Sequence, residues 1–157
     1  MSLKIRECCY EDYEAVAYLV MQVHRLHLKN RPDVYCDVEE PMKKERFKAV
    51  IDGEDKLFVA EWDGKIAAYA IVRMTETLSF SMIKHKKYAY IDDFCVDANM
   101  KRKGIGKSLF EHIMEYVKTQ KAESIQLSVW EFNKDALGFY EALGMKTRNR
   151  RMELDIL

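Results

Sequence analysis

The sequence predicts an α/β protein with a central mixed β-sheet flanked by helices. Apolar runs of strand length alternate with stretches of helical periodicity along the whole chain. A hairpin signal at Asp63-Gly64 indicates antiparallel strands in the first half. A strand–loop–helix–strand order in the second half implies a parallel pair. The 157 residues suffice for one domain with a sizeable core and are few for two, so we expect a single domain over residues 1–157.

The first third of the chain is predicted to hold a short strand and two helices. Leu3 to Arg6 is the strand. A helix over about residues 12–28 follows from positions that recur at helical spacing, and Arg31-Pro32-Asp33 ends it. A second helix is expected from about Pro41, which suits a first turn, to Ile51.

The rest of the chain is predicted to supply five strands and two helices. Their ranges are Leu57–Trp62, Ile66–Met74, Tyr88–Val96, a helix from Ile105 to about Gln120, Ile125–Trp130, a helix over Asn133–Leu143, and Met145–Leu154. Gly144 is expected to cap the last helix. Leu78 to Lys87 is interpreted as a polar connection, and its basic run Lys84-His85-Lys86-Lys87 as a solvated loop.

The charge balance and the cysteines exclude several classes of protein. The 26 basic and 26 acidic residues cancel, whereas nucleic-acid binding favours a basic surface. No apolar run reaches the roughly 18 residues of a membrane span, and residues 1–6 lack the apolar core of a signal peptide. We therefore expect no nucleic-acid or membrane partner and a reduced, cytoplasmic protein. Neither a disulfide framework nor a zinc pattern fits the four cysteines, which are Cys8, Cys9, Cys36 and Cys95.

The segment that says most about function is the basic loop at residues 101–108, Lys101-Arg102-Lys103-Gly104-Ile105-Gly106-Lys107-Ser108. It follows a predicted strand and opens a predicted helix. Gly104 and Gly106 let the backbone turn sharply and approach a ligand closely. The helix begins with unpaired N–H groups and a partial positive charge. We therefore predict that Arg102, Lys103, Gly104, Ile105, Gly106, Lys107 and Ser108 hold a phosphate-bearing ligand.

Three known phosphate loops can be compared with the basic loop. A P-loop requires glycine where Lys101 stands, and a dinucleotide fingerprint requires glycine where Leu109 stands. The third pattern, Gln/Arg-x-x-Gly-x-Gly/Ala, fits apart from Lys101 in its first position. This is the pyrophosphate loop of the GCN5-related N-acetyltransferases (GNAT), and the chain resembles the bacterial members of that family. A surface turn with solvated charges is the remaining alternative.

A second motif strengthens this resemblance, which in element order covers nearly the whole chain. The family pattern Asn-x-x-Ala-x-x-Phe-Tyr-x-x-x-Gly-Phe is matched by Asn133, Ala136, Phe139, Tyr140 and Gly144, with Met145 in place of the last Phe. The resemblance implies acetyl-coenzyme A as cosubstrate. It also implies that Asn133 and Ala136 bind the cofactor and that Tyr140 faces its sulfur. The residues alone also allow other roles. Asn133 can be a helix N-cap, and Tyr140 can be a core residue whose hydroxyl needs a hydrogen-bond partner.

The predicted central strand carries two adjacent carboxylates, Asp92 and Asp93. The run resembles the Glu-Asp-Phe-Phe-Val segment of diamine and polyamine acetyltransferases. That resemblance makes Asp92 the expected base or ammonium binder, with Glu131 in reserve; a salt-bridged structural aspartate is the alternative. Alternation places Asp92 and Asp93 on opposite faces of an unbulged strand. If the strand bulges, as the family's does, backbone N–H groups of Phe94, Cys95 and Val96 face the acetyl group and the cofactor arm.

Taken together, these features predict a single-domain N-acetyltransferase of the GNAT fold. An amine of a small molecule, peptide or protein attacks acetyl-coenzyme A directly, without a metal. Two rivals come from other classes. Tyr140 and Asn133 argue against the first, a catalytically silent acyl-coenzyme A binding module with a regulatory role. The second, a nucleotide-binding protein that uses Gly106-Lys107-Ser108, fails on Lys101. His24 and His27 are interpreted as packing or pocket residues, because no third metal ligand follows at useful spacing. A homodimer is also kept open, because the family often dimerises.

Overall fold

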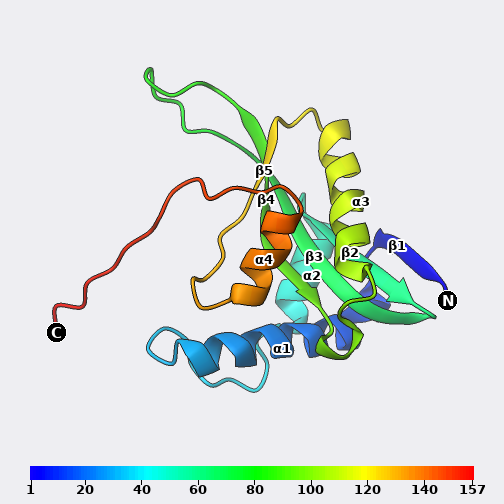
Figure 1. Ribbon diagram of the computed structural model, residues 1–157. Coiled ribbons are helices and arrows are strands. Elements are labelled where there is room, and N and C mark those ends of the chain that lie inside the picture. The colour runs from blue at the N-terminus through cyan, green and yellow to red at the C-terminus, as the bar shows by residue number, and fades with distance from the viewer. The chain divides into compact units, whose positions relative to one another are not determined.

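Five strands form one mixed sheet in the computed structural model, which describes all 157 residues (Figure 1). The chain divides into a first unit, Met1–Leu127, and a second unit, Ser128–Leu157. The sheet lies in the first unit, with its strands side by side in chain order. The strands are β1 (Leu3–Glu7), β2 (Lys56–Trp62), β3 (Lys65–Glu76), β4 (Lys87–Val96) and β5 (Ser124–Gln126).

The strand pairing confirms the predicted mixture of directions. β1, β2, β3 and β4 pair antiparallel, and β5 pairs parallel to β4. The β2–β3 hairpin turns at Asp63 and Gly64, which both have positive φ, 49° and 81°. Two positive φ angles are what the favoured two-residue hairpin turn requires, so this short signal fixes the local register.

One face of the sheet packs against two helices, α1 (Tyr13–Asn30) and α2 (Lys44–Asp52). Val16 and Leu19 of α1 are fully buried, and the rings of Tyr13 and Phe47 meet edge to face at 5.3 Å. Each fully buried aliphatic side chain contributes about 1.5–3 kcal/mol to the free energy of folding. Tyr69, Ile71 and Cys95 lie on this face, together with Leu57 and Val59.

The opposite face of the sheet packs against α3 (Ile105–Thr119), which a short 3₁₀ turn, η2 (Ala98–Met100), joins to β4. The ring of Phe58 lies 5.0 Å from that of His112, and the ring of Phe94 lies 6.5 Å from that of Phe110. Consecutive strand residues therefore serve opposite layers, as the period of two requires.

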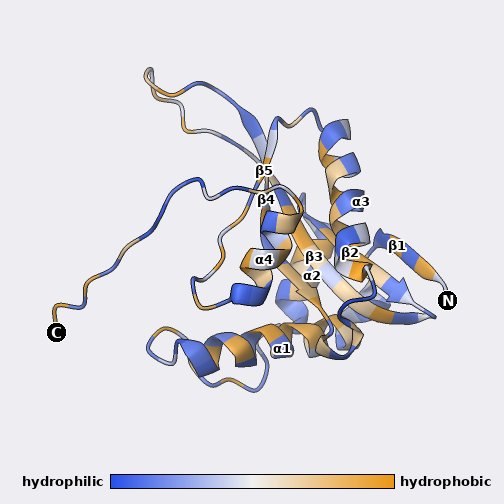
Figure 2. Cartoon of the chain, in the orientation of Figure 1, coloured by the Kyte–Doolittle hydropathy of each residue, from blue (hydrophilic) through white to orange (hydrophobic).

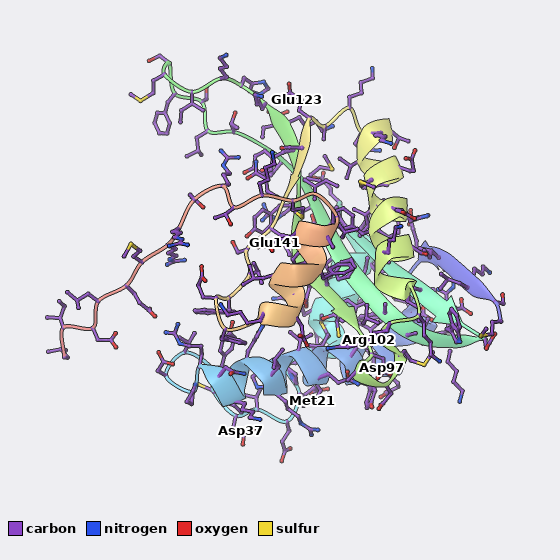
Figure 3. The ribbon with its side chains drawn as sticks, in the orientation of Figure 1. Met21, Asp37, Asp97, Arg102, Glu123 and Glu141 are labelled. Carbon is purple, nitrogen blue, oxygen red and sulfur yellow. The ribbon has the colours of Figure 1, made fainter.

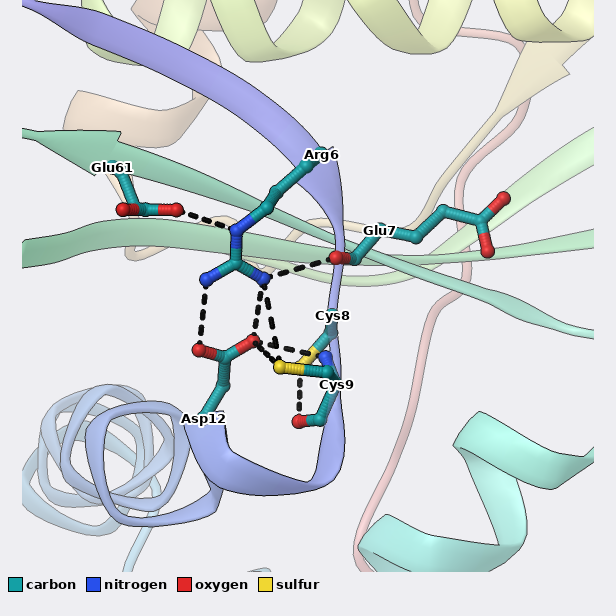
Figure 4. A network of polar contacts seen from close by, with 6 residues as sticks. All are labelled: Arg6, Glu7, Cys8, Cys9, Asp12 and Glu61. Carbon is teal, nitrogen blue, oxygen red and sulfur yellow. Dashed lines mark hydrogen bonds and ion pairs between the residues drawn. The ribbon is translucent and has the colours of Figure 1, made fainter. Parts of the chain in front are cut away.

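A polar network ties β1 to β2 and to the start of α1 (Figure 4). The two terminal nitrogens of Arg6 reach the two carboxylate oxygens of Asp12 at 2.7 and 2.9 Å, and its Nε donates to Glu61. Asp12 also accepts the backbone N–H of Cys9 at 2.9 Å, within the 3₁₀ turn η1 (Tyr10–Asp12) that leads into α1. The buried Asp12 carboxylate is thereby fully compensated, as burial of a charge requires.

Residues 77–86 join β3 to β4 as a projecting loop, called the arm here (Figure 1). Thr77 closes its base: its N–H donates to the carbonyl of Lys86 at 2.9 Å, and its hydroxyl accepts the N–H of Lys86 at 2.9 Å. The ladder therefore runs farther than the predicted strands, to Glu76 and Lys87.

Two predicted strands differ from the structure. β5 ends at Gln126 rather than Trp130, and residues 145–157, where Met145–Leu154 was predicted to be a strand, form no regular element. Met152, Leu154 and Ile156 do alternate, but their side chains are 83–89% exposed. A strand needs a hydrogen-bonding neighbour as well as alternation, and sequence shows only the alternation.

The second unit contains one helix, α4 (Lys134–Ala142). The predicted cap is confirmed: Gly144 has φ 90°, its N–H donates to Glu141, and the N–H of Met145 donates to the carbonyl of Tyr140. This pair of bonds is a Schellman motif. None of the helices has both the length and the apolar character needed to cross a membrane.

Candidate active site

The part of β4 beyond β5 is the first feature of the candidate site. β5 pairs only with Tyr88, Ala89 and Tyr90, so β4 continues over residues 91–96 with no strand on that side. The predicted site residues Phe94, Cys95 and Val96 lie in this part of the strand.

A β-bulge lies in the middle of β4. Val72 of β3 pairs with Ile91, but the next residue, Ile71, pairs with Asp93, so Asp92 is the extra residue. The bulge shifts the alternation, which places Asp93 on the face of Ile71 and Cys95 instead of the face of Ile91.

Asp92 forms an ion pair with Arg73. The Arg73 Nε and a terminal nitrogen each lie 3.1 Å from one carboxylate oxygen, and the guanidinium also stacks 5.2 Å from the ring of Tyr90. Arg73 shares the face of Ile71, two residues away on the same strand. Asp92 and Asp93 therefore lie on one face, and the opposite-face expectation for an unbulged strand does not hold here.

Asp93 has different surroundings. It is half-buried and accepts a hydrogen bond of 2.7 Å from the hydroxyl of the fully buried Tyr69. Burial raises the pKa of the Asp93 carboxyl, although the Tyr69 hydroxyl and the guanidinium of Arg46 on α2 act in the opposite direction. The two adjacent carboxylates therefore differ: one forms a partly exposed ion pair, and the other is desolvated.

The basic loop follows η2 and opens α3, as predicted. Figure 2 shows it as a strongly hydrophilic stretch, and Figure 3 labels Arg102 near Asp97 at the carboxyl end of β4. Arg102 and Gly104 both have positive φ, 64° and 77°. No side chain caps the N-terminus of α3 at Gly104, so the first N–H groups of the helix remain for a ligand.

The cations of the basic loop are placed differently from one another. Lys103 holds its ammonium 5.4 Å from the ring centre of Trp62, and Lys107 lies 3.9 Å from Glu111 one turn along α3. Residues 101–104 are exposed, whereas Ile105 and Gly106 are buried. An exposed basic loop in front of an uncapped helix fits the pyrophosphate of a coenzyme.

Cys95 is a buried neutral thiol. Its Sγ donates to the carbonyl of Leu19 at 3.7 Å, and burial raises its pKa to about 12. A nucleophilic cysteine needs a lowered pKa and access to solvent. The Cys95 side chain therefore serves packing, and any contact with a ligand comes from its backbone.

The other predicted site residues lie in the second unit. Asn133 caps α4, because its side-chain oxygen accepts the N–H of Ala136 at 3.1 Å. Tyr140 lies two helical turns after Asn133, and its ring meets that of Phe139 at 5.2 Å. Glu131 is exposed between two aromatic residues, Trp130 and Phe132, whose rings stack at 6.1 Å.

The two histidines of α1 pack against Tyr35. The ring of His24 lies 6.3 Å from that of Tyr35, and the ring of His27 lies 5.1 Å from it. Burial lowers the pKa of His27, so this ring is predominantly neutral at neutral pH. No group of three or more His, Cys, Asp or Glu side chains is arranged to hold a metal ion.

The chain forms a five-stranded mixed sheet whose fourth strand leads, through η2, to an exposed basic loop and the uncapped start of α3. The sequence profile of the Acetyltransferase (GNAT) family matches residues 20–145. This chain therefore belongs to the GNAT family of acetyltransferases, as its motifs predicted.

Two curated relatives cover part of the chain. An N-acetyltransferase of Methanocaldococcus jannaschii is 30% identical over 95 residues, 60% of this chain and 41% of that protein. The ribosomal protein bS18-alanine N-acetyltransferase of Escherichia coli is 28% identical over 82 residues, 52% of this chain and 49% of that enzyme. The chain thus spans about half or less of the length of these relatives.

Solved structures match over nearly the full length. A mutant of the BH1408 protein from Bacillus halodurans is 37% identical, with a TM-score of 0.95 over 98% of this chain and 99% of that one. Glucosamine-6-phosphate N-acetyltransferase from Arabidopsis thaliana is 22% identical, with a TM-score of 0.71 over 99% of both chains. The second likeness shows the fold alone, and it confirms the predicted fold class.

Sequence reasoning missed Arg73 and Tyr69, the partners of the two carboxylates. Both lie on β3, about 20 residues before Asp92 and Asp93 in the chain. Their contacts depend on strand register and on the bulge, and neither leaves a local signal. An arginine and a tyrosine on the strand preceding an Asp-Asp pair is the one hint the sequence offers.

Proposed function

We propose that this protein is an N-acetyltransferase that moves the acetyl group of acetyl-coenzyme A to a primary amine. The observation that carries the proposal is the basic loop in front of the uncapped N-terminus of α3, which η2 joins to the part of β4 that β5 does not pair with. An anion site and a row of backbone hydrogen-bonding groups are the two things that a long phosphorylated thioester needs.

The residues of the first unit fit acetyl-coenzyme A. Backbone N–H groups of residues 104–107 and the Arg102 side chain bind pyrophosphate oxygens, with Lys103 and Lys107 as further cations. The backbone of Phe94, Cys95 and Val96, in the part of β4 beyond β5, binds the amide arm and the thioester carbonyl. Acetyl-coenzyme A supplies the reactive thioester, and the chain orients it.

The chain must also move two protons. A primary amine with a pKa near 10.4 is ammonium at neutral pH and loses a proton before it attacks. Asp92, or a water that it holds, accepts this proton. As the C–S bond breaks, Tyr140 donates a proton to the departing sulfur, and the proton that the acylated nitrogen loses restores the Tyr140 hydroxyl through solvent; Asn133 holds the cofactor arm.

The names of related proteins favour amines without choosing one. One relative acetylates an alanine of a ribosomal protein, and one structural neighbour acetylates glucosamine 6-phosphate. The acceptor of this chain is therefore sought among peptide N-termini, amino sugars and small amines.

Thiol release from acetyl-coenzyme A over a panel of such amines tests the proposal. Amine-dependent release is expected, together with tight calorimetric binding of acetyl-coenzyme A and none of ATP. Binding without release for any amine would favour the silent binding module. Preference for ATP would favour the nucleotide-binding rival.

The Tyr140→Phe variant tests the proton donor, because it removes only the hydroxyl. We expect turnover to fall by roughly 10²-fold or more, the usual value of a positioned acid, with unchanged cofactor affinity. The melting temperature serves as the control for folding. If the variant has the melting temperature and the turnover of the wild-type chain, Tyr140 has only a packing role.

A further inference from the structure

A glutamine of α1 contacts the turn that leads into the basic loop. The side-chain amide of Gln22 donates to a carboxylate oxygen of Asp97 at 3.2 Å, and its carbonyl oxygen accepts the N–H of Ala98 at 3.0 Å. Asp97 is the N-cap of η2, and Ala98 is its first residue. In Figure 3, Asp97 lies next to α1, close to Met21, the neighbour of Gln22 in the chain. A half-buried amide that uses its donor and its acceptor on one turn fixes that turn relative to α1.

Asp97 connects this contact to the rest of η2. The carboxylate oxygen that accepts from Gln22 also accepts the N–H of Asn99 at 3.0 Å, and the Asp97 carbonyl accepts the N–H of Met100 at 2.8 Å. The N–H of Asp97 donates to the carbonyl of Ala67 on β3 at 2.8 Å. The turn that precedes the basic loop is therefore tied to the sheet and, through Gln22, to α1.

Packing does little to hold this part of the chain. Residues 98–99 and 101–104 are exposed. The turn and the loop border an open cavity of about 490 Å³, whose lining includes Tyr18, Trp62 and Met100. A segment with few buried apolar contacts opens easily, so its conformation depends on its hydrogen bonds.

The basic loop has a conformation that one of its residues disfavours. Arg102 has φ 64°, in the left-handed region that suits glycine better than a residue with a side chain. A residue keeps such a conformation where the chain around it is held in place. On the C-terminal side the support is the buried start of α3, Ile105 and Gly106, and on the N-terminal side it is η2. Loosening η2 would let Arg102 leave the left-handed region.

We propose that Gln22 and Asp97 are positioning residues, which hold the basic loop in the shape that receives the pyrophosphate of acetyl-coenzyme A. This inference rests on the proposed function and adds to it the contacts that order the cofactor site in advance. A loop that is ordered before the ligand arrives binds more tightly, because less conformational entropy is lost on binding. Both residues act through the backbone of residues 98–104 and not by contact with the cofactor.

The charge of Asp97 makes the sign of its effect informative. A carboxylate near a pyrophosphate site repels the ligand, so electrostatics alone predicts that its removal tightens binding. Loss of positioning predicts the opposite. We expect Asp97→Ala to weaken binding of acetyl-coenzyme A about tenfold. Asp97→Asn keeps an oxygen that can accept both hydrogen bonds and is expected to bind at least as tightly as the wild-type chain.

Limited digestion with trypsin measures the order of the basic loop without any ligand. The loop offers cleavage sites after Lys101, Arg102 and Lys103, and an exposed segment is cleaved according to how often it opens. Gln22→Met keeps the length of the side chain and removes both hydrogen bonds. It is expected to speed cleavage in the basic loop severalfold. Cleavage after the exposed Arg150 is the internal standard and is expected to be unchanged.

Calorimetry of the full chain with acetyl-coenzyme A measures the consequence for binding. Gln22→Met is expected to weaken binding about tenfold and, with an amine that supports thiol release, to raise the KM for acetyl-coenzyme A at unchanged kcat. Gln120→Met is the matched control, because Gln120 is also half-buried and its amide contacts Thr119 at the far end of α3. This control is expected to change neither the affinity nor the cleavage of the basic loop.

The outcomes distinguish this inference from the proposed function. If the wild-type chain does not bind acetyl-coenzyme A, the proposed function is wrong, and the positioning role is wrong with it. If the wild-type chain binds and Gln22→Met binds equally tightly, only the positioning role is wrong. Cleavage of the basic loop that is no faster in Gln22→Met than in Gln120→Met, or tighter binding by Asp97→Ala, would also overturn it. A lower melting temperature with unchanged affinity and cleavage would mean that Gln22 only stabilises the fold.

Discussion

Asp92 and Asp93 are neighbours in sequence with different chemistry. Asp92 is partly exposed and held by two nitrogens of Arg73, whereas Asp93 is desolvated beside the Tyr69 hydroxyl. A base on the surface can exchange its proton with water and meet an incoming ammonium ion. A half-buried carboxylate bonded to a buried tyrosine holds β4 to β3. We therefore keep Asp92 as the base and give Asp93 a structural role.

The pH dependence of turnover separates these roles. With saturating acetyl-coenzyme A, Asp92→Asn is expected to lower turnover most near neutral pH, where the amine is protonated, and less as pH approaches the amine pKa. Asp93→Asn is expected to lower the melting temperature and to give a deficit that does not vary with pH. Glu131→Gln tests the reserve candidate and is expected to keep the wild-type profile. If the turnover deficit of Asp93→Asn varies with pH and that of Asp92→Asn does not, Asp93 is the base. If the deficit of all three variants is independent of pH, none of the three carboxylates is the base.

A second prediction at the scale of the residue concerns the contribution of Asp12 to the stability of the fold. The Arg6 guanidinium holds the pKa of the Asp12 carboxyl far below its usual range, helped by the N–H of Cys9. Because the folded pKa is depressed, this stabilisation is fully present above the unfolded pKa of about 3.9 and is lost as pH falls below it. Asp12→Asn should therefore lower the free energy of unfolding by about 2 kcal/mol at pH 7, the scale of charged hydrogen bonds.

Urea unfolding of the wild-type and Asp12→Asn chains at neutral and acidic pH measures this effect. The difference between them is expected to shrink as the solution becomes acidic. Glu7→Gln breaks an exposed ion pair with Lys56, 3.0 Å long, and is the control, expected to change stability by less than about 0.5 kcal/mol. A difference that persists undiminished at low pH would mean that the charge of Asp12 is not what stabilises the fold.

At the scale of the element, glycine substitutions distinguish the effect of backbone strain from the effect of ligand binding at the basic loop. Gly104 and Gly64 have similar positive φ angles, 77° and 81°, and a Cβ on either would meet no atom of the chain within 4 Å. Alanine at either position should therefore cost a similar stability, about 1 kcal/mol. Only at Gly104 would the added methyl stand where the proposed pyrophosphate approaches the helix.

We expect Gly104→Ala to weaken acetyl-coenzyme A binding about tenfold, or 1.4 kcal/mol, and Gly64→Ala to leave it unchanged. Calorimetry compares the affinities, and thermal unfolding compares the stabilities. Equal affinities in the two variants would exclude the basic loop from cofactor binding.

Elements with a local signal were predictable from sequence, and those that depend on a partner were not. The Asp63-Gly64 turn, the Gly144 cap and the basic loop each follow from glycines that adopt positive φ. The bulge at Asp92 depends on how β4 meets β3, and the short β5 depends on how many residues of β4 it can pair with. Strand register and strand pairing are set by residues far away in the chain. Alternation within one segment therefore predicted the length of β5 wrongly and left the bulge open.

At the scale of the whole molecule, the predicted single domain requires residues 1–127 and 128–157 to fold together. Each unit contains one of the two tryptophans: Trp62 ends β2 in the first, and Trp130 precedes α4 in the second. Tryptophan fluorescence of Trp130→Phe therefore reports on the first unit, and that of Trp62→Phe on the second. A domain that unfolds cooperatively gives coincident transitions with different probes.

We expect the free energy of unfolding of the two single-tryptophan variants to fall with urea concentration with the same slope. In each variant, the fluorescence transition is expected to coincide with the circular-dichroism transition. The slope is the informative quantity, because it scales with the surface exposed on unfolding. Removal of a ring can shift the midpoint of one variant, but it leaves the slope of a cooperative unit unchanged. If Trp130 reports a shallow transition at lower urea while Trp62 and circular dichroism still report folded protein, residues 128–157 unfold separately. Asn133 and Tyr140 would then belong to a unit that binding of acetyl-coenzyme A must hold in place, and saturating acetyl-coenzyme A would move the Trp130 transition to higher urea.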